Sequence, residues 1–154
     1  MIGSLLYLTA SCSDNAFSVG VCARYQAYTK ESHLLVVKCI IKYVNRTLGY
    51  GIWFSTDTIA EIIGFSEADW AGCADDRKST SRGCFYLGYN LVVWHSKKQN
   101  AISFSTAEAE YIATGSCYAQ MLWMKKMLHD YGIDQNTLTL FYDNTSAINI
   151  SKNP

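Results

Sequence analysis

The sequence predicts an α/β fold in which helices pack on a mixed β-sheet. Three short runs of strand-like composition follow one another at 59–67, 83–89 and 91–96, and a possible further strand lies at 101–104. A long helix-forming segment comes next and is followed by a strand-like run at 137–142. Because a crossover helix returns the chain to a parallel strand, this order predicts three antiparallel strands, a helix, one parallel strand and a last helix.

The start of the long helix is marked by a capping box, Ser105-Thr106-Ala107-Glu108. Glu108 is the third residue after Ser105, so we expect it to cap the helix and not to bind a ligand. The pattern continues to Gly132 through a set of spaced apolar and small residues: Tyr111, Gly115, Tyr118, Leu122 and Leu128. The composition of 144–152 predicts one more helix.

The N-terminal third of the chain predicts a helical hairpin. Segments 13–25 and 32–44 have helical patterns, and Leu34, Val37, Ile41 and Val44 fall on one face of the second. A change of pattern between 48 and 58 predicts two domains, 1–55 and 56–154. A chain of 154 residues with 49% apolar residues can bury one ordinary core and a small appendage.

Charge and cysteine content exclude some classes of function. Thirteen basic residues balance thirteen acidic ones, so attraction to a nucleic-acid backbone must come from local clusters. The six cysteines show no spacing suited to zinc, and we expect reduced thiols. The opening residues lack a basic leader and an apolar run long enough for a signal peptide or a membrane span. The sequence therefore predicts a cytoplasmic or nuclear protein with no membrane partner.

Carboxylates lie at positions that the predicted fold would bring together. Glu67 ends the first strand, Glu110 lies in the first turns of the long helix, and Asp143 follows the last strand, while Asp69 shares the face of Glu67. Such hard oxygen ligands select Mg²⁺ or Mn²⁺, and a carboxylate cluster can support two-metal hydrolysis of a phosphodiester. The alternative is structural: solvated strand ends, a charge favoured by the helix dipole, and an N-cap.

Two hydrophilic clusters are candidates for contact with a nucleic acid. One runs from Arg77 to Arg82 and the other from Lys97 to Asn100. They could meet the phosphates and 2′-hydroxyls of an A-form-like duplex, or they could be solvated turns. The expected contact residues are Arg77, Lys78, Ser79, Thr80, Lys97, Lys98, Gln99 and, after the last strand, Asn144. The sequence contains no triad, P-loop or dinucleotide fingerprint.

Five linked motifs follow one another along the second half of the chain: Glu67-Ala68-Asp69-Trp70-Ala71-Gly72, Asp75-Asp76-Arg77-Lys78-Ser79-Thr80-Ser81, Trp94-His95-Ser96-Lys97-Lys98-Gln99-Asn100, Ser105-Thr106-Ala107-Glu108-Ala109-Glu110-Tyr111 and Asp143-Asn144-Thr145-Ser146-Ala147-Ile148. In order and spacing they resemble the ribonuclease H domain of copia-type retrotransposon Pol polyproteins. The N-terminal part, from Gly3 to Thr47, looks like the helical end of the same polyprotein's reverse transcriptase. The resemblance implies a ribonuclease H-like fold that cuts the RNA strand of RNA–DNA hybrids with four carboxylates and Mg²⁺. Glu110 then corresponds to the catalytic glutamate and Asp143 to the third acid.

The sequence also departs from the family pattern. Glu67 replaces the usual aspartate, Arg82 replaces a glycine, and the family continues past Asn153-Pro154 into a strand and helix that carry the fourth acid. We therefore expect a weak or inactive nuclease, residual binding of hybrids, and self-association through an uncovered sheet face. The alternative is a non-catalytic interaction or effector protein that its host has reused.

Overall fold

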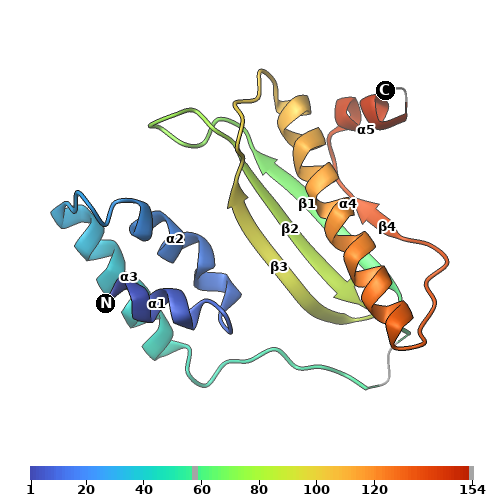
Figure 1. Ribbon diagram of the computed structural model, residues 1–154, viewed down its shortest axis with the longest axis horizontal. Helices are drawn as coiled ribbons and strands as arrows, with labels where there is room; N and C mark the ends of the chain where they lie inside the picture. Colours follow the sequence, from blue (N-terminus) through green and yellow to red (C-terminus); the bar gives the residue numbers. More distant parts are fainter. Residues whose placement is uncertain (57–58, 153–154) are drawn as a thin grey trace. The chain divides into compact units, whose positions relative to one another are not determined.

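The computed structural model describes residues 1–56 and 59–152. Its helices and strands form two units. The first unit is Met1–Trp53 and the second begins at Phe54 (Figure 1). The first unit is entirely helical, whereas the second holds the whole sheet. The residues that the sequence marks as a candidate site all belong to the second unit.

The first unit consists of α1 (Ile2–Leu8), a 3₁₀ turn (Ser13–Asn15), α2 (Ala16–Arg24) and α3 (Glu31–Arg46). The two predicted helices are present, and α1 was not predicted. Its seven residues contain one buried side chain, Leu5, so they carry little periodic signal. The core consists of Leu5, Val19, Cys22, Val37 and Ile40. On α3, Val37 of the predicted face is buried and Val44 is half-buried, whereas Leu34 and Ile41 are exposed, so the buried face coincides with the predicted one only in part.

The second unit is built on a four-stranded sheet of order β3-β2-β1-β4, with β1 at Ile62–Asp69, β2 at Thr80–Leu87, β3 at Asn90–Lys98 and β4 at Thr139–Phe141. β1 pairs antiparallel with β2, and β2 with β3, whereas β4 runs parallel to β1. The predicted mixed α/β fold is confirmed, and it is compatible with a ribonuclease H-like fold. The chain reaches β4 through α4, as the crossover rule requires.

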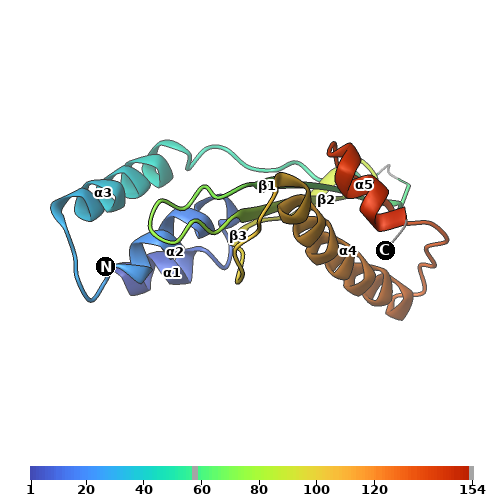
Figure 2. The ribbon, with the colours of Figure 1, turned by 90° about the horizontal axis from the view of Figure 1, so that it is seen from above.

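Helix α4 (Thr106–Asp130) covers one face of the sheet, and α5 (Thr145–Lys152) follows β4 (Figures 1 and 2). The predicted cap is present, because the Ser105 hydroxyl accepts a hydrogen bond from the Glu108 N–H at 3.1 Å. The Glu108 carboxylate accepts from the N–H of Phe104 at 2.7 Å, one residue earlier than in a standard capping box. Tyr111, Tyr118 and Leu122 of the predicted pattern lie on the exposed side of α4.

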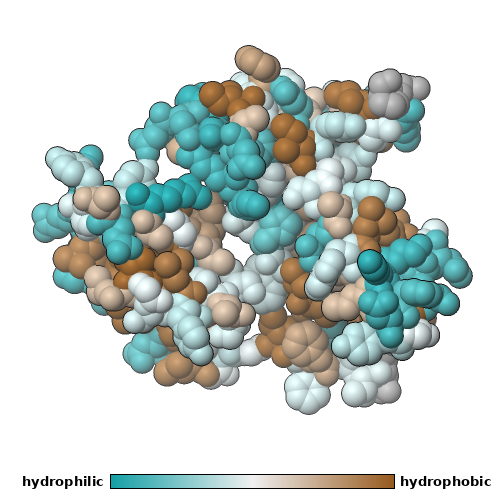
Figure 3. Space-filling view, in the orientation of Figure 1, coloured by the Kyte–Doolittle hydropathy of each residue, from teal (hydrophilic) through white to brown (hydrophobic). Residues whose placement is uncertain are grey.

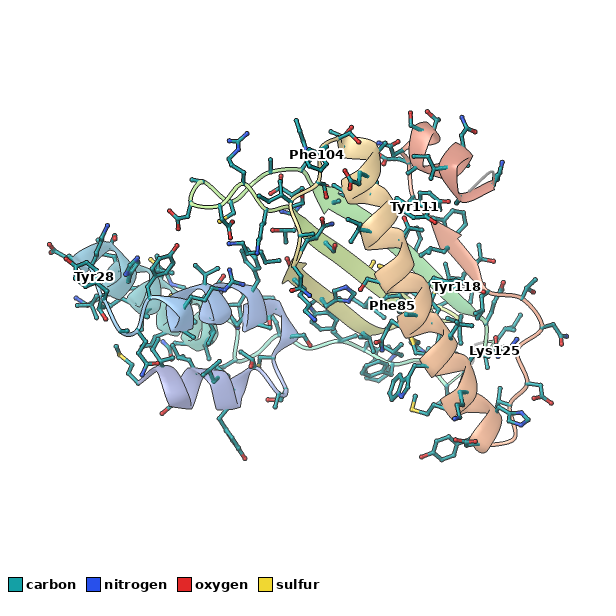
Figure 4. All side chains as sticks on the ribbon, turned by 45° about the horizontal axis from the view of Figure 1, so that its top comes forward. Tyr28, Phe85, Phe104, Tyr111, Tyr118 and Lys125 are labelled. Atoms are coloured by element: carbon teal, nitrogen blue, oxygen red, sulfur yellow. The ribbon has the colours of Figure 1, made fainter. Side chains whose placement is uncertain are left out.

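The core lies between α4 and the strands β1 and β2. It contains Ile62, Phe85, Cys117, Met121, Met124 and Leu128, and Phe85 points from the sheet toward α4 (Figure 4). Two glycines allow this close approach: a Cβ on Gly64 would lie 2.7 Å from the Met121 sulfur, and one on Gly83 would lie 2.7 Å from the Cys117 sulfur. On the other face, the rings of Phe65 and Phe141 stack at 5.2 Å and are about half exposed. The expected self-association through this face stays a prediction.

The prediction of a possible strand at 101–104 is wrong, because these residues form a loop. Their polar groups are used in side-chain contacts and not in a ladder of backbone hydrogen bonds. The backbone carbonyl of Ser103 accepts a hydrogen bond from the Trp70 indole N–H at 3.0 Å. The Ser103 hydroxyl donates to the side-chain amide oxygen of Gln99, also at 3.0 Å. The side chains of Ile102 and Phe104 are exposed, so apolar composition alone misled the prediction.

Candidate functional site

One end of the sheet gathers most of the residues that the sequence singled out. Strand register pairs Asp69 with Thr80, and Thr80 with Lys98, so the end of β1, the start of β2 and the end of β3 are neighbours. Because β4 is parallel to β1, its carboxyl end points the same way, and the first turn of α4 lies at this end (Figure 1). We call this end of the sheet the edge: it consists of the ends of β1, β3 and β4, the start of β2 and the first turn of α4. The edge is the candidate site.

Glu110 is the buried member of the acid set, with 7% of its surface exposed. Its Oε1 accepts a hydrogen bond from the Ala68 N–H at 2.9 Å, which ties α4 to β1. Its Oε2 is buried and has no hydrogen-bond partner among the described residues. Burial raises the pKa of this carboxyl; the Ala68 N–H lowers the pKa, and the charges of Asp143 and Glu67 raise it further. The fold therefore places Glu67 and Asp143 each within electrostatic reach of Glu110.

Glu67 and Asp69 are both paired with one cation, Arg82. Glu67 lies opposite Arg82 in the antiparallel register, with 3.6 Å between Oε1 and Nη1. Nη2 of Arg82 lies 3.7 Å from Oδ2 of Asp69. These three side chains are about half exposed or more, so each pair is partly solvated. The sequence shows Arg82 in place of the family's glycine but does not reveal this pairing, because the pairing depends on the register of β1 and β2.

Asp143 and Asn144 lie between β4 and α5 and have different surroundings. Asp143 is exposed. Asn144, expected to contact nucleic acid, instead uses its side-chain oxygen to accept a hydrogen bond from the Ala147 N–H at 3.0 Å. Asn144 is thus the N-cap of α5. The alternative that Asp143 is this cap is wrong, which leaves its carboxylate available at the edge.

The oxygen ligands are of the type that Mg²⁺ prefers, yet their arrangement does not fit a metal ion. In residues 1–56 and 59–152, no group of three His, Cys, Asp or Glu side chains is placed to hold one. Glu67 and Asp69 are turned to Arg82, although the unpartnered Oε2 of Glu110 is the kind of atom that an ion would satisfy. The sequence predicts Glu67 and Asp69 as metal ligands, whereas in the structure both are paired with Arg82.

Exposed cations lie at the same end of the sheet as the acids. Arg77 is exposed in the loop between β1 and β2, and Lys97 is exposed near the end of β3. Hydrophilic side chains gather over this loop (Figure 3). Lys98 is already engaged, because its Nζ lies 2.8 Å from Oδ1 of Asp76 and 3.0 Å from the Cys73 sulfur. Hydrogen bonds from Lys98 and from Cys73 lower the pKa of Asp76 to about 2. Lys78 is half-buried.

Ser79, Thr80 and Gln99, also expected to contact nucleic acid, are buried in the fold. The Ser79 hydroxyl accepts from the Ala71 N–H at 3.1 Å, which shapes the loop after β1. Gln99 donates to the Ser81 hydroxyl and to the Ala109 carbonyl, each at 2.9 Å. Their side chains therefore position the edge and are not presented at its surface.

Comparison with known proteins identifies the family. The chain is 36% identical over 154 residues to the retrovirus-related Pol polyprotein from transposon TNT 1-94 of Nicotiana tabacum, a match that covers 99% of the chain. It is 32% identical over its whole length to the corresponding polyprotein from transposon RE1 of Arabidopsis thaliana. The chain belongs to the retrovirus-related Pol polyproteins of transposons. It spans 11% of the length of these relatives.

The chain is also similar to a shorter protein. It is 33% identical over 124 residues to the secreted RxLR effector protein 161 of Plasmopara viticola, and the match covers 80% of the chain and 87% of that protein. No family model and no solved structure matches the chain. Within the part of the chain that the structure describes, no helix is both long and apolar enough to cross a bilayer. The resemblance predicted from the motifs is confirmed at the level of the Pol family.

Proposed function

We propose that the second unit is a ribonuclease H-like module that binds RNA–DNA hybrids at the edge formed by β1, β2, β3 and the start of α4. The first unit would be the helical end of the reverse transcriptase region. The observation that carries the proposal is buried Glu110, which accepts a hydrogen bond from the Ala68 N–H, the residue between Glu67 and Asp69. Its carboxylate lies within electrostatic reach of Glu67 and Asp143, and the exposed cations Arg77 and Lys97 belong to the same end of the sheet. Acids that face the reacting phosphate and cations that hold its neighbours are the two parts that such a module needs.

We propose that the edge cleaves the RNA strand of the hybrid with Mg²⁺ or Mn²⁺, and that this cleavage is weak in this chain. Glu67 carries its carboxylate one methylene farther than an aspartate would, and both Glu67 and Asp69 are paired with Arg82. A misplacement on the order of 1 Å can cost about 10²-fold in rate. Because Arg82 would still pair with Asp69, Glu67→Asp alone should not restore cleavage.

Binding tests the proposal. Fluorescence anisotropy would compare a labelled RNA–DNA hybrid with a DNA duplex of the same sequence over a range of salt concentrations. We expect tighter binding of the hybrid, and the variant Arg77→Gln/Lys97→Gln should reduce the salt slope by about two, roughly one for each lost phosphate contact. Lys126→Gln, which removes an exposed charge from the last turns of α4, is the matched control. Equal affinity of wild type and double variant would refute this assignment of the edge.

Cleavage of the same labelled hybrid in Mg²⁺ or Mn²⁺ tests the second part. We expect little product from the wild-type chain. Rapid metal-dependent cutting that disappears in Glu110→Gln would show that the module is a competent nuclease and that the effect assigned to Arg82 and Glu67 is wrong.

A second candidate is a non-catalytic interaction or effector protein with the same fold. The similarity to the effector of Plasmopara viticola, most of whose length is matched, favours it. On this proposal the acids have no role, so Glu110→Gln would leave every binding property unchanged and the hybrid would be bound no better than a DNA duplex. The anisotropy experiment therefore separates the two candidates.

A further inference from the structure

Arg82 is placed to act as a built-in counter-ion for the acids of the edge. Its two terminal nitrogens point to different carboxylates, Nη1 to Glu67 and Nη2 to Asp69. Strand pairing fixes this arrangement, because Arg82 is the cross-strand partner of Glu67 and Asp69 lies two residues farther along the same face of β1. A forked guanidinium can contact two carboxylates at once, which a lysine ammonium does less well.

We propose that Arg82 is the reason why these acids do not fit a metal ion: it competes with divalent cations for Glu67 and Asp69 and so weakens metal binding at the edge. This inference rests on the proposed function, since it concerns the same acids. The guanidinium places one positive charge where an ion would need both carboxylates, and a bound cation would have to displace it or lie beside it. Both outcomes are unfavourable, the first because the ion pairs are lost and the second because like charges repel.

The geometry also explains why the competition is reversible. The contacts of 3.6 and 3.7 Å are long for charge-assisted hydrogen bonds, and the side chains of Arg82 and Asp69 are each 49% exposed. Exposed pairs of this kind are weak, so two of them together correspond to a factor on the order of five in affinity. Removal of Arg82 should therefore tighten metal binding by about fivefold, not by several orders of magnitude.

The test uses the full chain and Mn²⁺ alone, followed by electron paramagnetic resonance of the free ion. Arg82→Gln removes the charge from an exposed side chain, whereas Arg82→Lys keeps it. Lys126→Gln controls for the change in net charge. We expect the tightest Mn²⁺ binding in Arg82→Gln, an affinity near wild type in Lys126→Gln, and an affinity between these two in Arg82→Lys. The gain should be lost when Glu67→Gln and Asp69→Asn are added to Arg82→Gln.

Equal Mn²⁺ affinity in wild type and Arg82→Gln would overturn the inference, and so would a gain that persists without the two acids. An equal gain in Lys126→Gln would attribute the effect to net charge and would also overturn it. Hybrid binding by the same proteins in the absence of divalent metal reports separately on the proposed function. If hybrid binding is intact and Mn²⁺ affinity is unchanged, only the role of Arg82 fails; if the hybrid is not bound, the proposed function fails.

Discussion

Gln99 is the polar side chain whose removal should most disturb the candidate edge. Its amide nitrogen donates to the Ser81 hydroxyl and the Ala109 carbonyl at 2.9 Å, and its oxygen accepts from the Ser103 hydroxyl at 3.0 Å. Gln99 is 6% exposed, so Gln99→Ala removes three hydrogen bonds at a site with little access to water. At roughly 1 kcal/mol for each bond, the expected loss is about 3 kcal/mol of the free energy of unfolding.

Urea denaturation would measure this loss. Three of the four tryptophans lie in the second unit, so tryptophan fluorescence reports mainly on the unit that contains Gln99. For a unit of this size, 3 kcal/mol corresponds to a decrease in Tm of more than about 10 °C. Asn100→Ala, which removes an exposed amide from the same unit, is the control and should change little. A loss below about 1 kcal/mol for Gln99→Ala would show that water replaces these hydrogen bonds and that the buried network does not hold α4 to the sheet.

Three further predictions concern protonation and packing. The pKa of Glu110 is raised in the folded state, so the wild type loses stability as pH rises through that folded pKa; Glu110→Gln should be more stable at neutral pH, and urea denaturation should show this gain vanish below the unfolded pKa. The pKa of Asp76 is lowered to about 2 by its contacts with Lys98 and Cys73, so its contribution to stability is present above its ordinary value of 3.8 and lost as pH falls toward 2; NMR titration should give a midpoint near 2 that returns toward 3.8 in Lys98→Met. Gly64→Ala should cost about 1–3 kcal/mol in urea denaturation, because its Cβ would lie 2.7 Å from the Met121 sulfur, and an unchanged midpoint would show that Met121 moves aside freely.

The fold could be predicted where local chemistry and chain order agree. The order of three strands, a capped helix, a strand and a helix fixed the mixed sheet, because few topologies join these elements without breaking the crossover rule. Which face of each helix is buried was harder to predict. On α4 the buried positions are small or flexible residues such as Ala113, Cys117 and Met121, while Tyr111 and Tyr118 are exposed. Large side chains dominate a hydropathy pattern, but Gly64 and Gly83 leave room only for a helix that presents small or flexible groups.

The candidate site was predictable as a set of residue types and not as a set of contacts. Carboxylates at strand and helix ends identified Glu67, Glu110 and Asp143, yet the sequence does not reveal which is buried or which cation each one meets. Burial of Glu110 depends on the distance between α4 and β1, and the Arg82 pairs depend on a strand register that a shift of one residue would abolish. The same dependence makes the role of Arg82 testable: if register alone creates its contacts with Glu67 and Asp69, then substitution of Arg82 should change metal affinity and leave the β1–β2 pairing intact.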